Sequence, residues 1–192
     1  MDVDLADSSV PVPKMLSMHI LRMRDAAYAR RGETIVAPTS LDLGPGDRLT
    51  HVAANAREAR GLAMLAAGLA RATAGSVSIG EYDPRVQPAH CKRIAAFVAH
   101  DPLPLSQIDT AHYIAYRAAL WDIDPDDARV RAQALLERLA PMHEAFAFPI
   151  AAALVPSPHL LVLDRPQAAF VPQILAAAAG CAVLVVRAEE RG

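Results

Sequence analysis

The sequence predicts an α/β fold in which a parallel sheet is flanked by helices. Residues 159–164 carry a continuous apolar run that ends in Asp164, and residues 181–186 form a second apolar run. Strands of this kind are typical of a parallel sheet that is buried on both faces. Earlier in the chain, residues 106–140 have the periodicity of helices. Strands on both sides of a helical middle predict an α/β domain with a helical insertion.

The first part of the chain predicts a pair of strands. Residues 18–23 alternate weakly between apolar and polar and indicate one strand, and residues 34–43 are expected to pair with it as a second. Residues 28–33, Tyr-Ala-Arg-Arg-Gly-Glu, are expected to form the turn between them. The next segment, Gly-Pro-Gly-Asp at 44–47, is a strong turn signal.

The next elements alternate between strand and helix. Residues 48–54 predict a strand, and residues 57–71 predict a helix with so few polar positions that it should be well buried. Residues 75–80 have period two and indicate a half-buried strand. Residues 93–100 predict another strand. This order of elements is the one expected of an α/β domain.

Helix signals dominate the middle of the chain. Asp124 is expected to cap a helix whose first residue is Pro125, because proline is favoured at the first helical position. After the apolar run that ends at Asp164, residues 171–179 predict a short helix. The residues expected on one face of the helix after Pro125 are Ala128, Ala132, Leu135, Leu136 and Leu139.

Composition limits the classes of function. The 192 residues suit one domain, and 53% are hydrophobic, which is a globular composition. A net charge of -2 and a pI near 6.4 give no basic footprint for nucleic acid. Cys91 and Cys181 have no metal-ligand spacing, so a reduced cytosolic setting is the default, with a disulfide between them left open. His51, His112 and His143 have no metal spacing either.

No membrane segment is predicted. Residues 1–7 are acidic and do not have the pattern of a signal peptide. Residues 145–163 and 166–186 are uncharged, and about 20 apolar residues suffice to span a bilayer. Both stretches are interrupted by proline, glutamine or glycine, so we expect them to form several short elements.

Several segments, taken in order, resemble the ATP-binding domain of ABC transporters across about residues 18–188. The resemblance implies a P-loop NTPase-like sheet flanked by helices, with a reduced helical insertion at about 104–148. It also implies a flexible segment over 1–17, followed by a single ABC-ATPase-like domain over 18–192. The matching segments are 41–47, 65–69, 75–80, 93–100, 151–154 and Pro-His-Leu-Leu-Val-Leu-Asp-Arg-Pro at 158–166.

The resemblance places a phosphate loop, G-x-x-x-x-G-K-[ST], on residues 53–60. Ala53 then takes the first glycine, and Asn55 falls on an asparagine that is common in the family. Glu58 takes the second glycine, Ala59 the lysine and Arg60 the hydroxyl residue. Side chains obstruct the curl of backbone amides around phosphate, and Ala59 cannot reach the β- and γ-phosphates as lysine would. The resemblance therefore implies a degenerate loop.

The other family motifs are also altered. Asp164 matches the aspartate that orients magnesium, whereas Arg165 replaces the glutamate that acts as general base. Arginine cannot accept a proton at working pH. His100 takes the place of the Q-loop glutamine, and Tyr28 matches the aromatic residue that stacks on adenine. The signature Leu-Ser-Gly-Gly-Gln is absent.

Each candidate residue also has a plain structural interpretation. An apolar strand that ends in aspartate is common in α/β proteins, so Asp164 alone fits a structural role better than a magnesium site. A single tyrosine such as Tyr28 is usually a packing residue. Four arginines, at 57, 60, 165 and 187, either converge on an anion or form ordinary salt bridges, and the second interpretation is favoured.

Two function classes follow, and the first is preferred. It is a degenerate ABC-type ATP-binding-like subunit without ATPase activity, which acts as a structural or regulatory partner of a larger complex, such as a transporter. Its vestigial nucleotide-binding residues would be Tyr28, Ala53, Asn55, Arg57, Arg60 and Asp164. No cofactor, catalytic residue or metal is then expected, and the partner would be an ABC-type ATPase subunit or a membrane complex. The chain would be cytoplasmic, peripheral to the inner face of a membrane.

The alternative is a functional ATP-binding subunit of an ABC transporter with divergent motifs. It would use ATP and magnesium, with Asp164 at the metal. A third, weaker possibility is an unrelated α/β domain, which would lack strand–loop–helix geometry around residues 48–70.

Overall fold

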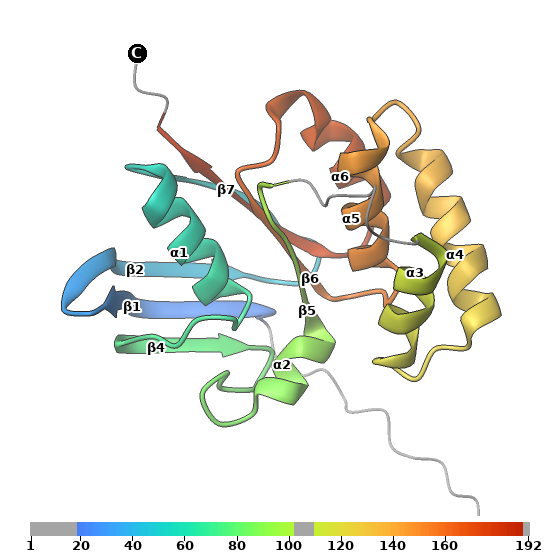
Figure 1. Cartoon of the computed structure of the whole chain (residues 1–192). Coiled ribbons are helices and arrows are strands. Elements are labelled where there is room, and N and C mark those ends of the chain that lie inside the picture. Colours follow the sequence, from blue (N-terminus) through green and yellow to red (C-terminus); the bar gives the residue numbers. More distant parts are fainter. Residues whose placement is uncertain (1–18, 102–109, 190–192) are drawn as a thin grey trace, which may run out of the picture.

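Two sheets organise the computed structural model, which describes residues 19–101 and 110–189 (Figure 1). The smaller sheet is antiparallel and has the strand order β2-β1-β4. Its first hairpin closes through Arg31 and Gly32, whose φ angles of 53° and 81° are both positive. Two consecutive positive φ angles are what a two-residue hairpin turn of the primed type requires. The strands are β1 Leu21–Arg30, β2 Glu33–Leu43 and β4 Ala74–Ile79.

The larger sheet is parallel, in the order β3-β7-β6-β5. All five residues of β6 are buried, as the apolar run at 159–164 predicts. The structure therefore confirms the α/β fold class, with a parallel sheet flanked by helices. The strands are β3 Arg48–Ala53, β5 Ala95–Val98, β6 Leu160–Asp164 and β7 Ala182–Ala188.

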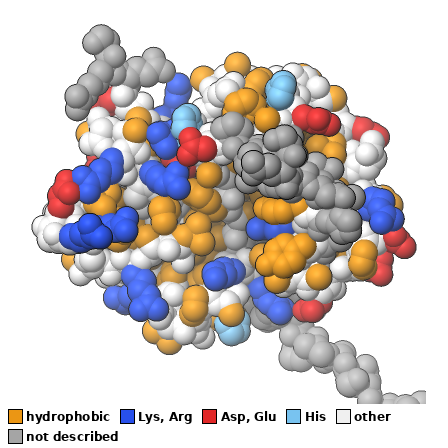
Figure 2. Space-filling view, in the orientation of Figure 1, with side chains coloured by type: hydrophobic (Ala, Val, Ile, Leu, Met, Phe, Trp, Pro, Cys, Tyr) orange, Lys and Arg blue, Asp and Glu red, His pale blue; other side chains and the backbone are white. Residues whose placement is uncertain are grey.

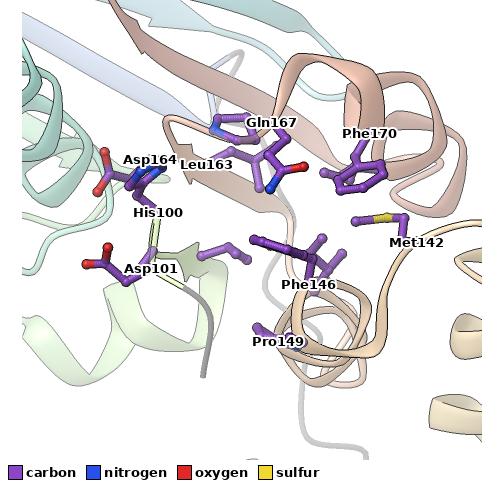
Figure 3. A pocket seen from close by; sticks show the side chains of 15 residues that line it. His100, Asp101, Met142, Phe146, Pro149, Leu163, Asp164, Gln167 and Phe170 are labelled. Carbon is purple, nitrogen blue, oxygen red and sulfur yellow. The ribbon is translucent and has the colours of Figure 1, made fainter. Parts of the chain in front are cut away.

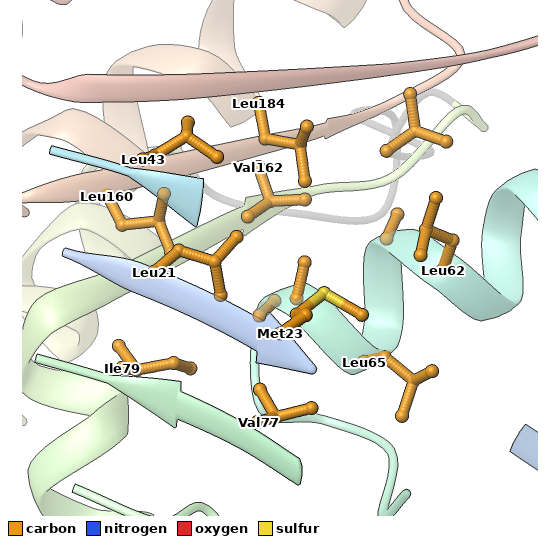
Figure 4. Close-up of a cluster of buried hydrophobic side chains, with 14 of the residues drawn as sticks. Leu21, Met23, Leu43, Leu62, Leu65, Val77, Ile79, Leu160, Val162 and Leu184 are labelled. Atoms are coloured by element: carbon orange, nitrogen blue, oxygen red, sulfur yellow. The ribbon is translucent and has the colours of Figure 1, made fainter. Parts of the chain in front are cut away.

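One face of the parallel sheet packs on α1, Ala56–Ala66, which also contacts the antiparallel sheet. Successive strand residues point to opposite faces, so Val162 and Leu184 join the core on the α1 side. Figure 4 shows Leu62 and Leu65 of α1 within this cluster, with side chains from both sheets. This core makes α1 and both sheets a single packed unit.

The other face of the parallel sheet packs on α5 and α6. Leu161 and Leu163 of β6, with Val183 and Val185 of β7, form a second core with these helices.

Asp124 caps α4, as predicted, and its side chain accepts hydrogen bonds from the amides of residues 126 and 127 at 2.8 and 3.3 Å. The helices on this side are α3 Thr110–Ala119, α4 Pro125–Arg138, α5 Glu144–Leu154, a 3-10 turn at Ala168–Phe170 and α6 Val171–Ala177.

Three local expectations are corrected. Tyr28 lies inside β1 and not in the turn, because the positive φ angles that make the turn fall on Arg31 and Gly32. The strand predicted from Arg93 starts at Ala95, because the helix α2, Pro88–Ile94, precedes it. Pro149, one of the prolines expected to interrupt residues 145–163, lies inside α5 without ending it, and seven of the eleven residues of α5 are buried. This burial offsets the hydrogen bond that proline removes.

The predicted segment 1–17, and residues 104–109 of the predicted insertion, lie outside the described residues. The helices α3 and α4 lie within the remainder of that insertion, and α5 continues past its predicted end at residue 148. Within the described ranges, no helix is both long and apolar enough to cross a membrane.

Both cysteine thiols are free and buried, and we expect them to be unreactive in the folded protein. Burial raises the pKa of Cys91 to about 11 and that of Cys181 to about 12. Because the thiolate is the reactive form, alkylation by iodoacetamide at pH 8 should be about a hundredfold slower in the native than in the urea-unfolded chain. Mass spectrometry of timed samples measures both rates. Equal rates in the two states would contradict the buried placement.

Candidate functional site

The connection from β3 to α1 is where the resemblance places a phosphate loop. Only Ala54 and Asn55 lie between the strand and the helix. Asn55 has an extended backbone and is the N-cap, and its Oδ1 accepts a hydrogen bond from the amide of Glu58 at 2.9 Å. Residues aligned with the second half of a phosphate loop are therefore already helical.

Glu58 completes this cap from the other side. Its Oε2 accepts a hydrogen bond from the amide of Ala54 at 2.9 Å. The arrangement resembles a capping box, in which the N-cap and the third helical residue satisfy backbone donors reciprocally. A carboxylate also suits the positive end of the helix dipole. Two amides that could face a phosphate are thus bonded to side chains of the chain itself.

Arg57 forms an ion pair away from this cap. Both of its terminal guanidinium nitrogens donate to the Glu33 carboxylate at the start of β2, one of them at 2.7 Å. The hydrogen bond and charge of Arg57 lower the pKa of Glu33. Figure 2 shows that lysine and arginine side chains gather on the side of this face formed by α1 and the antiparallel sheet. The ion pair between Arg57 and Glu33 therefore links α1 to β2 in this region.

Asp164, at the end of β6, is held by two arginines. Its side chain is fully buried. Arg165 donates from Nε to Oδ1 at 2.9 Å and from Nη2 to Oδ2 at 3.4 Å. Arg60 of α1 places Nη1 at 3.8 Å from Asp164 Oδ2 and at 3.7 Å from Asp101 Oδ2. The buried carboxylate is thus neutralised by cations from two elements.

The backbone of Arg165 is fixed as firmly as its side chain. Its φ of 47° lies in the left-handed region, which costs an ordinary residue about 1 kcal/mol. The Arg165 amide donates to the carbonyl of Val186 on β7 at 2.7 Å, and His100 Nδ1 lies 2.8 Å from the Arg165 carbonyl oxygen. The hydrogen bond to Asp164 raises the pKa of Arg165. These contacts hold the guanidinium against Asp164.

Tyr28 packs beneath α1. Its ring carbon Cδ1 lies 3.6 Å from the position that a Cβ on Gly61 would occupy. The side chain is half-buried against the first core. Ala53 is buried at the end of β3, opposite Ala188 of β7. The role of Tyr28 as an adenine-stacking residue stays a prediction.

The structure brings some of the predicted site residues together and separates others. Arg60 and Arg165 both contact Asp164. Asn55 caps the helix that carries Arg60. Arg57 faces Glu33 instead. Arg57, Arg60 and Arg165 therefore form ion pairs within the chain, which is the interpretation that the sequence favours for these arginines. Asp101 is a site residue that sequence reasoning missed, because no local pattern places it near Arg60.

Groups that a magnesium nucleotide would use are bonded to side chains of the chain itself in this structure. A phosphate would compete with Asn55 and Glu58 for amides of the helix start, and the Glu58 carboxylate would repel it. A magnesium ion would have to displace two guanidinium groups from Asp164. Among the described residues, no group of three or more His, Cys, Asp or Glu side chains could hold a metal ion.

A pocket of about 150 Å³ lies beside Asp164, between the ends of β5 and β6 and the helices α5 and α6. Figure 3 shows His100, Asp101 and Asp164 at one end and Met142, Phe146 and Phe170 at the other. The rings of Phe146 and Phe170 are 5.9 Å apart. The pocket thus joins an apolar wall to the Asp164 network, and sequence patterns gave no sign of it.

Comparison with known proteins identifies the fold. One solved structure, the ATP-binding subunit of an ABC transporter, superposes with a TM-score of 0.72 at 15% identity, over 88% of this chain and 79% of that one. Another, cbiO1 from Clostridium perfringens, part of the ABC transporter complex cbiONQ, gives 0.68 at 16% identity, over 89% and 79%. This chain therefore has the fold of ABC-type ATP-binding subunits. No family model and no curated protein matches its sequence.

Proposed function

We propose that the chain is a degenerate ABC-type ATP-binding-like subunit that lacks ATPase activity. The observation that carries the proposal is the self-capped start of α1. Asn55 and Glu58 bind amides at the position where a phosphate loop would have to stay open. At about 4 Å and an effective dielectric near 20, a carboxylate repels each phosphate charge by about 4 kcal/mol. That is about half the binding free energy of a micromolar ligand.

The Asp164 network supports the same conclusion for catalysis. Hydrolysis needs a group that can take a proton from the attacking water. Arg165 follows Asp164 in the chain, where the resemblance places that base, and its pKa is raised further by the carboxylate. A guanidinium stays protonated at all working pH values. The proposed subunit therefore has no general base at this position.

A protein partner is the second part of the proposal. The neighbours in structure are described as an ATP-binding subunit of an ABC transporter and as part of a transporter complex. We infer that this chain acts as a structural or regulatory partner of an ABC-type ATPase subunit or of a membrane complex. It would do so in the cytoplasm, peripheral to the inner face of a membrane, and without ATP or magnesium as cofactor.

One observation favours an alternative, a functional ATP-binding subunit with divergent motifs. Arg60 and Asp164 lie 3.8 Å apart, at the places where the resemblance expects a phosphate-loop residue and the magnesium-orienting aspartate. Arginine charge could then replace the charge of the missing lysine. The same Asp164 carboxylate would have to exchange Arg165 for magnesium.

Calorimetric titration with magnesium ATP separates the two functions. We expect no saturable heat and no rise in melting temperature up to about 1 mM nucleotide, because a ligand that binds only the folded state must stabilise it. Circular dichroism confirms that the sample is folded. A saturable micromolar signal that disappears in Asp164→Asn would overturn the proposal and support the alternative.

A further inference from the structure

A second cleft opens where β6 and β7 begin, at the end of the parallel sheet opposite to Asp164. Its volume is about 420 Å³, within the range of small-molecule sites. One wall is α4, and the others are the ends of α5 and α6 with the segments that lead into β6 and β7. We name this the basic cleft, and the residues that define its chemistry are Arg131, Arg138, Ser157, His159 and Gly180.

All of the charge that lines the basic cleft is positive. Arg131 and Arg138 both project from α4, and seven residues along a helix correspond to about 10 Å. His159 lies on another wall of the cleft, just before β6. No aspartate or glutamate is among the lining residues. The cleft therefore presents two guanidinium groups and an imidazole without a neutralising carboxylate.

Arg131 has an ordinary structural role that accounts for part of this charge. Its Nη1 lies 3.5 Å from the carbonyl oxygen of Val155, the residue that ends α5. Cations are favoured at the negative end of a helix dipole. The contact with Val155 and the dipole of α5 therefore explain the position of Arg131 without a ligand.

Arg138 is the last residue of α4, where the helix dipole also favours a cation, but no other group among the described residues engages its guanidinium. Within the part of the chain that the structure describes, it forms no ion pair and no side-chain hydrogen bond. Neighbours on the same helix are paired: Arg129 binds Asp126 at 2.7 Å, and Gln133 binds Glu137 at 3.1 Å. The contrast marks Arg138 as a charge that the fold leaves available inside a cleft.

Small residues keep the space between the walls open. Ala134 of α4 faces the cleft, and the chain turns into β7 at Gly180. Gly180 has a φ of 84°, and a Cβ there would meet no atom within 4 Å. The Ser157 hydroxyl group adds a neutral donor on the lining. Planar guanidinium groups bind phosphate and carboxylate through two parallel hydrogen bonds.

We propose that the basic cleft binds a small polyanion, a molecule with at least two phosphate or carboxylate groups that engage Arg131 and Arg138 together. Such a ligand would bridge α4 to the starts of β6 and β7. The site is separate from the Asp164 network and needs no metal ion.

Titration with inorganic triphosphate and with citrate, in magnesium-free buffer at low salt, tests the proposal by calorimetry. We expect saturable binding of at least one probe. Arg138→Gln should weaken it by about tenfold, the loss typical of one charge-assisted hydrogen bond. Ala134→Trp keeps both arginines and fills the cleft, so it should abolish binding. Preference for triphosphate indicates a phosphate ligand, and preference for citrate a carboxylate.

Arg129→Gln is the matched control, because it removes the same charge from the same helix outside the basic cleft. We expect this variant to bind the same probe with an affinity within about twofold of the wild type. That change is smaller than the one caused by the loss of one hydrogen bond. No saturable binding of either probe would overturn the proposal, as would equal losses in Arg129→Gln and Arg138→Gln. A nucleotide signal that survives Asp164→Asn but not Arg138→Gln belongs to the cleft and leaves the proposed function intact.

Discussion

Gly75→Ala is expected to lower the free energy of unfolding by about 3 kcal/mol or more. Gly75 has a φ of 70°, and a Cβ there would lie 2.1 Å from the carbonyl oxygen of Asp25 and 2.4 Å from that of Arg24. The conformation alone costs about 1 kcal/mol. Both contacts are with backbone atoms, so no rotation of a side chain can relieve them.

The backbone that Gly75 faces is itself fixed. The pairing of β1 with β4 shifts register between Arg24 and Ala27, which marks an irregularity in β1 around Asp25. Asp25 has a φ of 43°, and its amide donates to Ser40 Oγ at 2.9 Å. Moving this segment away from a new Cβ would break the contact with β2.

Chemical denaturation followed by circular dichroism measures the change for Gly75→Ala. Gly46→Ala is the matched control, because Gly46 has a φ of 76° and a Cβ there would meet nothing within 4 Å. The control isolates the conformational cost, about 1 kcal/mol. If Gly75→Ala costs no more than Gly46→Ala, β1 does not approach Gly75 as the structure describes.

The fold could be predicted because its signals are local. The apolar run before Asp164 indicated a buried parallel strand, and β6 is that strand. The cap at Asp124 marked the start of α4. The predicted turn at residues 28–33 contains the observed turn at Arg31 and Gly32 but starts too early, because the sequence around Tyr28 does not reveal which residues take positive φ.

The candidate site was less accessible to sequence reasoning. Asn55 followed by Glu58 is itself a cap signature, and it indicates a helix that starts at Ala56. The alignment to a phosphate loop instead treated this segment as a loop. No local pattern could show that Arg60 meets Asp164, because α1 and β6 are brought together only by the packing of the first core.

Asp164→Asn is expected to lower the free energy of unfolding by about 2 kcal/mol. Removing one partner of a fully buried ion pair costs about 3–5 kcal/mol. The cost should be smaller here, because the side chains of Arg165 and Arg60 are 20% and 48% exposed and can be solvated after the change. Asparagine also keeps the volume of the side chain and one acceptor for the Arg165 guanidinium.

Asp101→Asn is the control for Asp164→Asn, since Asp101 also lies near Arg60 but its side chain is 77% exposed. Exposed pairs contribute about 0.2–1 kcal/mol, so this variant should change stability by less than about 1 kcal/mol. Urea denaturation of the two variants and the wild type gives both values. In a working magnesium site, the aspartate is placed for ligand binding and can lower the stability of the folded protein. Replacing such a residue commonly raises the free energy of unfolding. A more stable Asp164→Asn variant would therefore argue for the functional ATP-binding subunit, whereas a loss well above that of Asp101→Asn identifies Asp164 as a structural carboxylate.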